Sequence, residues 1–214
     1  MSNVSRFNNP IEPGNATTNP TNIQNGTQYY NSVTNKLTVY ENGVWVTYPT
    51  KTEFDSFVTE TRNLSKSIAV ITDSKPNGTA GGTFTSGAWR TRTLNTLSDP
   101  MSIITSLASN EFTLPAGRYE IEAFAVGYLC GLNKIKLRNV TDNVDVIIGS
   151  NSFSNASSVQ GISQLDGVFT IDSAKTFQLQ HWCSVTRNTN GFGLAVSAGV
   201  DEVYASIKIR KLST

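Results

Sequence analysis

The sequence lacks the features of several common functional classes. Seventeen Lys and Arg residues against 16 Asp and Glu residues leave a net charge of only +1, and no basic run is present. Nucleic-acid binding needs a concentrated positive patch that releases counterions, so we expect no nucleic-acid partner. No apolar run approaches the ~20 residues that cross a bilayer, so we expect no membrane insertion.

Secretion signals, disulfide frameworks and cofactor motifs are also missing. Residues Met1–Phe7 lack the apolar stretch of a secretion signal, which predicts synthesis in a cytoplasm. Two cysteines, Cys130 and Cys183, are too few for a disulfide framework or a structural zinc site, and we expect reduced, packed thiols. The glycine-rich segment Gly78–Thr83 lacks the Gly-Lys-Ser/Thr ending of a phosphate-binding loop. We therefore expect no cofactor. We interpret these glycines as residues that give the backbone the conformational freedom needed for a tight crossing in a β-sandwich.

The single histidine offers little for catalysis. His181 lies in the run Thr176–Ser184, where strand alternation places its side chain on the apolar face. A histidine on such a face is more often a hydrogen-bonded core or interface residue than a catalyst. No Gly-x-Ser-x-Gly elbow accompanies it, which argues against a serine hydrolase.

Acidic residues provide two weaker candidates, for polysaccharide cleavage and for calcium. Glu120 and Glu122 share one strand face, but Arg118 beside them favours their charged forms over the protonated acid that a glycosidase needs. The segment Thr141–Asp145 gathers oxygen ligands, yet an ordinary Asx turn explains the same residues. We therefore expect neither enzymatic activity nor a bound metal.

A short helical seam separates two dissimilar parts of the chain. In the stretch Thr52–Ile68, a set of mostly apolar residues recurs at alternating spacings of three and four, with charged residues on the other faces. These seam positions are Phe54, Phe57, Thr61, Leu64 and Ile68. Two heptads are too few for a coiled coil by themselves, so we expect residues 50–68 to form a trimerisation stalk shared by several copies. The alternative is a lone amphipathic linker helix that lies on its own domain.

The chain before the seam has little capacity to fold alone. Residues 1–26 are rich in Asn, Thr and Pro without a hydrophobic period, which predicts an extended or disordered arm that docks onto a larger particle. Residues 27–49 contain three short β-prone runs, and Asn42-Gly43 suits a type I′ turn. We expect a small β-meander with Leu37 and Val39 on its apolar face. A meander of this size has too little core to be stable as a monomer.

Residues 69–214 predict an all-β domain. Short β-prone runs alternate with Gly, Asn, Asp or Pro turns, and no helix-period stretch of useful length appears. This pattern favours an all-β, jelly-roll sandwich head. The expected strands are Ile68–Thr72, whose first residue is also the last seam position, Trp89–Leu94, Glu111–Leu114, Arg118–Val126, Ile135–Val140, Val144–Gly149, Gly167–Ile171, Thr176–Val185 and Val203–Ile209. In the last strand, alternation predicts that Val203 and Ala205 share one face and that Tyr204 lies on the other.

Two regions carry a resemblance to known proteins. Residues Gly26–Trp45 are similar to a small module common in bacteriophage tail-fibre and tail-spike proteins, with a Lys-Leu-x-Val-Tyr strand followed by a Gly-x-Trp hairpin. Residues Asn77–Asn95, Phe112–Tyr119 and Thr189–Gly193 resemble the globular head of many phage fibres. That family is similar in turn to complement-type and tumour-necrosis-factor-like jelly rolls, in which three heads pack about a threefold axis. The resemblance implies a trimeric head, and the helical seam would replace the collagen-like stalk that this chain lacks.

The resemblance implies a homotrimeric phage fibre of the virion, most simply a tail fibre. Residues 1–49 would attach to other virion proteins, and the head would bind a host-surface glycan or protein. Recognition is expected in two polar loops, Ser150–Gln160 and Thr186–Gly191, because loops on a rigid scaffold commonly carry binding residues. The candidate receptor-binding residues are Asn151, Phe153, Asn155, Trp182, Arg187, Asn188 and Asn190. Trp182 lies on the polar face of its strand and suits a sugar platform or a trimer contact equally well.

Three alternatives stay open. The trimer would instead decorate the capsid as a head fibre, or the fibre would cleave a polysaccharide. A secreted cytokine-like ligand is disfavoured by the missing secretion signal.

Overall fold

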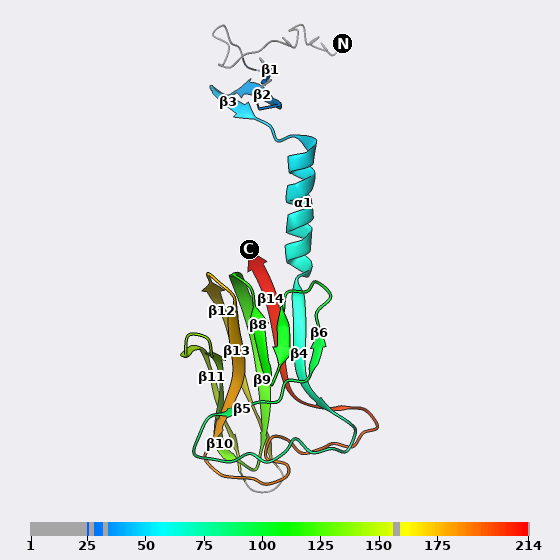
Figure 1. Cartoon of the computed structure of the whole chain (residues 1–214), viewed down its shortest axis with the longest axis vertical. Helices are drawn as coiled ribbons and strands as arrows, with labels where there is room; N and C mark the ends of the chain where they lie inside the picture. The colour runs from blue at the N-terminus through cyan, green and yellow to red at the C-terminus, as the bar shows by residue number, and fades with distance from the viewer. Residues whose placement is uncertain (1–24, 26–27, 32–33, 156–158, 214) are drawn as a thin grey trace, which may run out of the picture. The chain divides into compact units, whose positions relative to one another are not determined.

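The computed structural model describes residues 25, 28–31, 34–155 and 159–213, and contacts divide the chain into two units, Met1–Asn63 and Leu64–Thr214 (Figure 1). Apart from Asn25, the arm expected over residues 1–26 lies outside the described residues. Residues 62–66 are described by their backbone alone, so the seam position Leu64 has no described side chain.

The first unit contains the expected three-stranded meander. Its strands β1 (Gln28–Asn31), β2 (Lys36–Glu41) and β3 (Val44–Thr47) pair antiparallel in the order β1-β2-β3. The turn between β2 and β3 has positive φ at both Asn42 (50°) and Gly43 (88°), as a type I′ turn requires. The predicted apolar face is wrong at Leu37, which is 37 % exposed, whereas its neighbour Thr38 is buried. Thr38 Oγ1 lies 3.2 Å from Thr47 Oγ1, and this cross-strand hydroxyl contact selects the buried face.

Helix α1 (Lys51–Lys66) begins at a capping box. The backbone N–H of Thr50 donates to Glu53 Oε2 at 2.8 Å, and the backbone N–H of Glu53 donates to Thr50 Oγ1 at 3.2 Å. These reciprocal bonds satisfy amide groups that the first helical turn leaves without partners. On the outer surface of the helix, the side chains of Phe54 and Phe57 are 55 % and 67 % exposed. In the part of the chain that the structure describes, no helix has the length and apolarity needed to cross a membrane.

The prediction that the helix extends to Ile68 is wrong. Ile68 is the first residue of strand β4 (Ile68–Lys75) and pairs with Arg210. The preceding carbonyl, that of Ser67, accepts the backbone N–H of Lys211 at 3.0 Å. After Lys66 the backbone pairs with β14, so Ile68 belongs to the head and not to the seam.

The second unit is a jelly-roll β-sandwich of two antiparallel sheets (Figure 1). One sheet has the order β12-β9-β14-β4-β6, and the other has the order β11-β10-β13-β8-β7 with β5 paired to β13. The strands other than β4 are β5 (Arg90–Thr91), β6 (Thr96–Ser98), β7 (Ser106–Ala108), β8 (Glu111–Leu114), β9 (Gly117–Tyr128), β10 (Gly131–Asn139), β11 (Val144–Ser154), β12 (Gln160–Ile171), β13 (Lys175–Cys183) and β14 (Glu202–Ser213).

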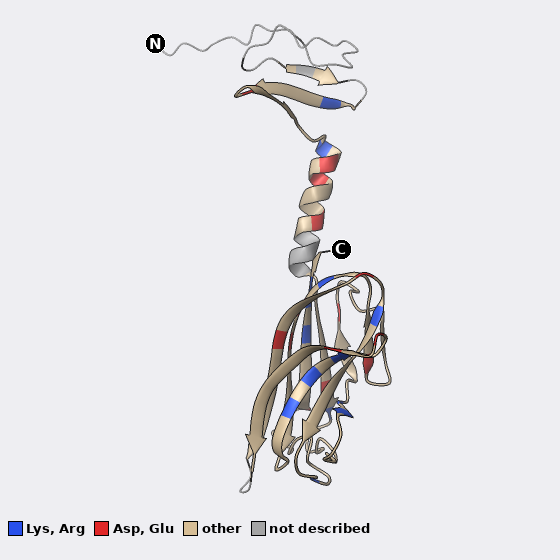
Figure 2. Ribbon diagram, turned by 90° about the vertical axis from the view of Figure 1, so that its left-hand side faces the viewer, with Lys and Arg blue, Asp and Glu red and all other residues tan. Residues whose placement is uncertain are grey.

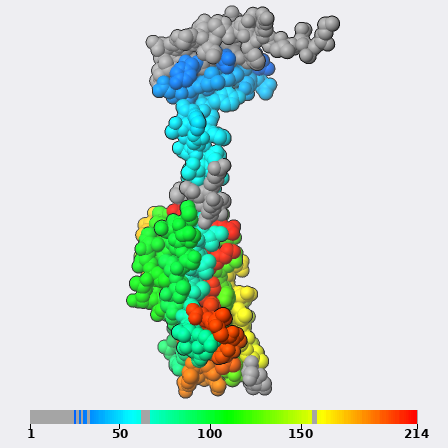
Figure 3. All heavy atoms as spheres, turned by 90° about the vertical axis from the view of Figure 1, so that its right-hand side faces the viewer, coloured from blue at the N-terminus to red at the C-terminus, as the bar shows by residue number. Residues whose placement is uncertain are grey.

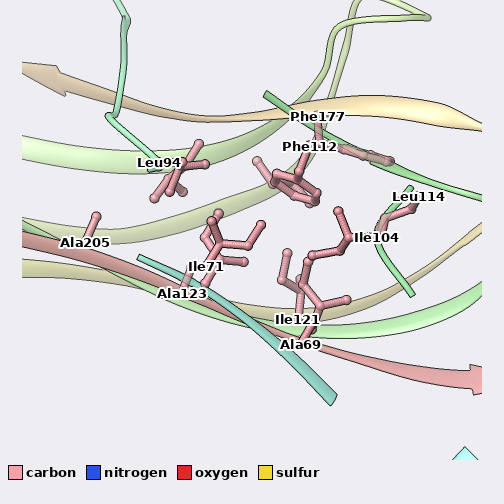
Figure 4. Close-up of a cluster of buried hydrophobic side chains, with 14 of the residues drawn as sticks. Ala69, Ile71, Leu94, Ile104, Phe112, Leu114, Ile121, Ala123, Phe177 and Ala205 are labelled. Atoms are coloured by element: carbon pink, nitrogen blue, oxygen red, sulfur yellow. The ribbon is translucent and has the colours of Figure 1, made fainter. Parts of the chain in front are cut away.

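The main core lies between the inner faces of the two sheets (Figure 4). Ile71 and Ile121 come from one sheet, and Phe112 and Phe177 come from the other. The rings of Phe112 and Phe177 stack with centroids 5.6 Å apart. Alternation of apolar residues along β9 and β13 is the physical reason for the layering, because every second side chain must leave water.

Strand β14 departs from its expected alternation. A register shift between Val203 and Ala205 inserts one extra residue, so Val203 is 47 % exposed while Tyr204 is buried. Tyr204 then donates its hydroxyl to the carbonyl of Thr79 at 2.7 Å. This bulge points the Tyr204 side chain toward the interior of the head, which local alternation did not predict.

The glycine-rich segments cross one another as the sequence predicted. The backbone N–H of Gly81 donates to the Gly193 carbonyl at 2.8 Å, and that of Phe192 donates to the Gly82 carbonyl at 3.0 Å. A Cβ on Gly81 would lie 2.6 Å from the carbonyl carbon of Phe192, so no larger residue fits. Figure 3 shows the orange-to-red segment before and within the start of β14 beside the teal segment that follows β4.

A second small core lies under this crossing. It consists of Phe84, Cys130 and Cys183 with Phe192 packed against them, and the rings of Phe84 and Phe192 stack at 4.3 Å. Both cysteines are free and buried, which confirms packed thiols. Burial raises the pKa of the Cys183 thiol to about 12, so this sulfur is protonated at neutral pH.

Candidate recognition surface

Three of the candidate binding residues lie on one face of the head, and this face is built by strand order. Strand β10 pairs with β11 on one side and with β13 on the other. Lys134 of β10 is directly opposite both Asn151 of β11 and Trp182 of β13. Their sequence neighbours Asn133 and Cys183 are buried, so the row Asn151–Lys134–Trp182 lies on the outer face.

The same face continues into an apolar end. Phe153 is opposite Leu132, and these two side chains are 54 % and 58 % exposed. Val185, which donates its backbone N–H to the Cys130 carbonyl at 3.0 Å, is 51 % exposed close to them. Exposed apolar side chains that gather in this way are typical of an interaction surface.

Of the predicted loop Ser150–Gln160, residues 150–154 and 160 are strand, and residues 156–158 lie outside the described residues. Asn151 and Phe153 belong to β11, which runs to Ser154, and β12 begins at Gln160. The Asn and Ser content of this segment favours a loop. The hydrogen bonds between strands involve only the backbone, however, so polar side chains are compatible with a strand. Asn155 follows β11 directly and is exposed.

The second predicted loop, Thr186–Gly191, is held in place by its own contacts. Arg187 forms a backbone bridge to Phe84, its Nε donates to Asn190 Oδ1 at 3.0 Å, and its guanidinium carbon lies 5.7 Å from the Tyr128 ring centroid. The side chains of Arg187 and Asn190 are therefore engaged in contacts within the head. Asn188 is exposed on the same loop and is the better placed of the three for a ligand.

Charge along the outer face of β10 is uneven. Lys136 Nζ is 2.9 Å from Asp145 and 4.3 Å from the centroid of the Trp89 ring, and Arg138 Nη1 is 2.8 Å from the same aspartate. Lys134 has no such acidic partner among the residues that the structure describes. Basic residues recur along the strands on this side of the sandwich (Figure 2).

Lys134 and Trp89 are not among the binding residues predicted from the sequence. The expected strand begins at Ile135, four residues after the observed start at Gly131, so Lys134 falls outside it and the alternation of Lys134, Lys136 and Arg138 on one face is missed. Trp89 reaches the face from the segment before β5, which pairs with β13 through Thr91 and Arg90. That pairing joins residues about ninety positions apart, and no local pattern signals it.

The carboxylates considered for calcium are bonded to cations. Asp145 contacts Lys136 and Arg138, and Asp142 Oδ1 lies 2.8 Å from Lys175 Nζ. The Lys175 hydrogen bond lowers the pKa of the Asp142 carboxyl, which favours its ionised form. Across residues 34–155 and 159–213, no group of three or more His, Cys, Asp or Glu side chains is arranged to hold a metal.

The carboxylates considered for glycoside cleavage are also paired. Glu122 Oε1 lies 3.1 Å from Lys208 Nζ, and Glu120 Oε2 lies 3.4 Å from Arg210 Nη1. Glu122 and Lys208 line an open depression of about 450 Å³ on the outer face of the sheet formed by β12, β9 and β14. Each carboxylate is therefore paired with a cation on the neighbouring strand β14, an arrangement that suits charge bridging.

His181 is fully buried, as alternation predicted. Its Nε2 lies 3.1 Å from Asn133 Oδ1, and its ring packs 4.6 Å from the Phe84 ring. Burial, and then the nearby charge of Arg92, lower the pKa of His181 well below its usual value, so the imidazole is neutral at pH 7. A neutral imidazole sealed in the core has no access to a substrate.

Similarity to known proteins is limited. No protein-family model matches the sequence, and no curated protein matches it. Among solved structures, the chain is similar to the globular domain of the zebrafish complement 1qA protein, with 14 % sequence identity and a TM-score of 0.41. The similarity covers 66 % of this chain and 93 % of that one. Identity and TM-score at this level carry no argument about ligand, partner or family, and the jelly-roll architecture rests on the strand order of the two sheets.

Proposed function

We propose that this chain is a homotrimeric, non-enzymatic fibre protein of a bacteriophage virion, whose head, residues 69–214, binds a glycan on the host surface. The attribution to a phage fibre rests on the sequence resemblance of residues Gly26–Trp45 and Asn77–Asn95. Residues 1–49 would attach the fibre to the particle. The binding role of the head is supported by the outer-face row that includes Trp182 and Asn151.

The observation that carries the trimer is the exposure of aromatic residues on α1. Phe54 and Phe57, three positions apart on one helix surface, are both more than half exposed. Burying a phenylalanine side chain contributes about 1.5–3 kcal/mol, so two such residues in each of three chains are a substantial driving force. Lys51, Glu53 and Asp55 supply polar surface on the same helix. An isolated helix of 16 residues is marginal in water, and association supplies what it lacks.

Three heads on one trimer would compensate for weak individual sites. An exposed ion pair contributes about 0–1 kcal/mol and an aromatic contact about 0.5–1.5 kcal/mol beyond its buried area. A single surface built from such contacts binds weakly. Linking several copies converts later binding events into intramolecular ones and raises avidity by about 10²–10⁴.

The oligomeric state of the full-length protein tests the proposal. We expect sedimentation velocity at micromolar concentration to give the mass of three chains, and the double variant Phe54→Ser/Phe57→Ser to dissociate. Phe112→Leu, a substitution in the head core that leaves α1 untouched, is the control and should remain trimeric. A well-folded wild-type monomer at the same concentration would contradict the proposal.

Adsorption separates the candidate roles. The isolated trimer, added at saturation, should block adsorption of the particle to its host if the head contacts the receptor. Antibody against the head, observed by electron microscopy on intact particles, would mark the tail for a tail fibre. Labelling over the capsid would instead favour a head fibre.

A further inference from the structure

We propose that the row Asn151–Lys134–Trp182 binds an acidic saccharide, in which a sugar ring carries a carboxylate or phosphate group. This inference rests on the proposed glycan-binding role of the head and names the class of glycan and the residues that select it. Lys134 would contact the anionic group, Trp182 would stack on the ring, and Asn151 would bond to hydroxyl groups.

The three side chains are brought together by backbone pairing. Lys134 is in register with Asn151 across the β10–β11 ladder and with Trp182 across the β10–β13 ladder. Residues directly opposite one another on antiparallel strands have Cβ atoms about 4.5–5.5 Å apart. The row therefore spans about 10 Å on one outer face, which places a cation between an amide and an indole.

The charge of Lys134 is the feature that selects an anion. Among the three basic residues along this face of β10, Lys136 and Arg138 share Asp145 at 2.9 Å and 2.8 Å. Lys134 makes no ion pair with any carboxylate in the described part of the chain. Lys134 is only partly exposed, and Trp182 beside it is partly exposed as well. A cation that is partly screened from water and lacks a counter-charge attracts an anionic group more strongly than a fully solvated one does.

The neighbours of Lys134 favour a sugar over other anions. Trp182 presents an aromatic surface, and Asn151 has an exposed amide that both donates and accepts hydrogen bonds. The apolar faces of a sugar ring and its hydroxyl groups match these two side chains. Nucleic acid would require several unpaired cations, and this row has one.

The shared carboxylate limits the positive charge of this face. Lys136 is 7 % exposed because it is enclosed between Asp145 and the Trp89 ring, which lies 4.3 Å from its Nζ. Asp145 bonds to both Lys136 and Arg138, which leaves one net positive charge at that end of the face instead of two. A ligand with one negative group per recognition unit therefore fits better than a densely charged polymer.

Paired probes on the purified trimer test the assignment. The first pair is oligogalacturonate and its methyl ester, which differ in charge and share the ring. The second pair is a phosphorylated mannose oligosaccharide and its unphosphorylated form. We expect binding, measured by bio-layer interferometry, to at least one acidic member, at least tenfold weaker binding to its neutral partner, and a loss of affinity as NaCl rises. Preference for the first or the second pair identifies the anionic group as carboxylate or phosphate.

Matched variants locate the binding site. Lys134→Gln and Trp182→Ala should each weaken binding of the acidic probe at least tenfold, and Lys134→Arg should retain it. Lys208→Gln removes the same charge from the opposite sheet and should leave binding unchanged. Thermal melting and sedimentation confirm that every variant is a folded trimer. Equal weakening by Lys134→Gln and Lys208→Gln, or no effect of Lys134→Gln, would overturn the assignment.

The outcomes also separate this inference from the proposed function. Binding of the wild-type trimer to neutral saccharides alone would overturn the acidic class while the glycan-binding role stands. If the wild-type trimer bound none of the saccharide probes and failed to block adsorption, both would be overturned.

Discussion

Nη2 of Arg92 lies 3.3 Å from Oδ2 of Asp73, and these two oppositely charged side chains are almost completely buried. The guanidinium also donates to the backbone carbonyls of Val126 and Tyr204, at 3.2 Å and 3.0 Å. Burial lowers the pKa of Arg92 to about 10, so Arg92 remains positively charged at neutral pH. Arg92, which lies in the segment after β5, thus connects to β4 through Asp73, to β9 through Val126 and to β14 through Tyr204.

Replacing Arg92 with Met should lower the free energy of unfolding by about 3–5 kcal/mol. The substitution leaves the buried Asp73 carboxylate with Lys75 as its remaining cation, at 3.3 Å, and an incompletely compensated buried charge is costly. Urea unfolding of the trimer at pH 7 measures the change. The double variant Arg92→Met/Asp73→Asn should cost less than the sum of the two single changes, because it removes both charges. Strict additivity would mean that the pair is not coupled.

Stability should decrease as the pH falls below about 6.5, because His181 is buried in its neutral form. Its pKa is lowered in the folded state, so between the folded and unfolded pKa values the unfolded chain binds one more proton. The free energy of unfolding should then fall by up to about 1.4 kcal/mol per pH unit. Urea titrations at pH 7.5, 6.5 and 5.5 measure this slope.

His181→Gln is the matched control for that pH dependence. It keeps a hydrogen-bonding group beside Asn133 but does not titrate in this range. We expect the slope between pH 6.5 and 5.5 to flatten in this variant. Glu202 and Asp142 have lowered pKa values and therefore act at more acidic pH. A wild-type slope that persists in His181→Gln would show that another group is responsible.

Gly193→Ala should destabilise the head by about 3 kcal/mol. A Cβ at this position would lie 2.0 Å from Cδ1 of the buried Tyr204, and the backbone φ of 147° already disfavours a side chain. Gly199→Ala is the control, because φ is also positive there (86°) but no heavy atom lies within 4 Å of the added Cβ. Thermal melting of the two variants compares steric overlap with backbone strain. Equal shifts would mean that overlap with Tyr204 contributes nothing.

Glu202→Gln should loosen the segment before β14. The Glu202 carboxylate accepts the backbone N–H groups of Ser197 (2.8 Å), Val196 (3.0 Å) and Gly78 (3.1 Å). The bonds from Val196 and Ser197 are the main reason that its pKa is lowered. Their stabilising effect is therefore present above about pH 4.5 and lost as the pH falls through the lower, folded-state pKa.

Hydrogen exchange at individual amides measures that loosening. The amides of Val196 and Ser197 should exchange several-fold faster in Glu202→Gln than in the wild type at pH 7, because a neutral amide oxygen accepts more weakly than a carboxylate. The amide of Gly81, which donates to the Gly193 carbonyl at 2.8 Å, should be unaffected. Unchanged protection at Val196 would show that the loop does not depend on this carboxylate.

Local patterns predicted the elements best where side-chain alternation and turn chemistry agree. Strand β8 begins and ends at the expected residues, Glu111 and Leu114, and Glu120 and Glu122 share one face of β9 as expected. Errors occurred where backbone pairing overrides side-chain preference. The helix ends at Lys66 instead of continuing to Ile68, and the Asn and Ser residues around Asn151 extend β11 where a loop was expected.

The sequence by itself determined that residues 69–214 form a β-sandwich, that His181 points into it, and that the glycines around Gly81 permit a close crossing. These properties depend on period-two alternation and on backbone freedom, which are local. Only the tertiary structure decided that Arg92 is buried against Asp73 and that Lys134 lies between Asn151 and Trp182, without a carboxylate partner among the described residues. Those contacts follow from the strand order β11-β10-β13 and from loops that meet across the sandwich. Strand order is set by the joint burial of distant segments, so no local pattern contains it.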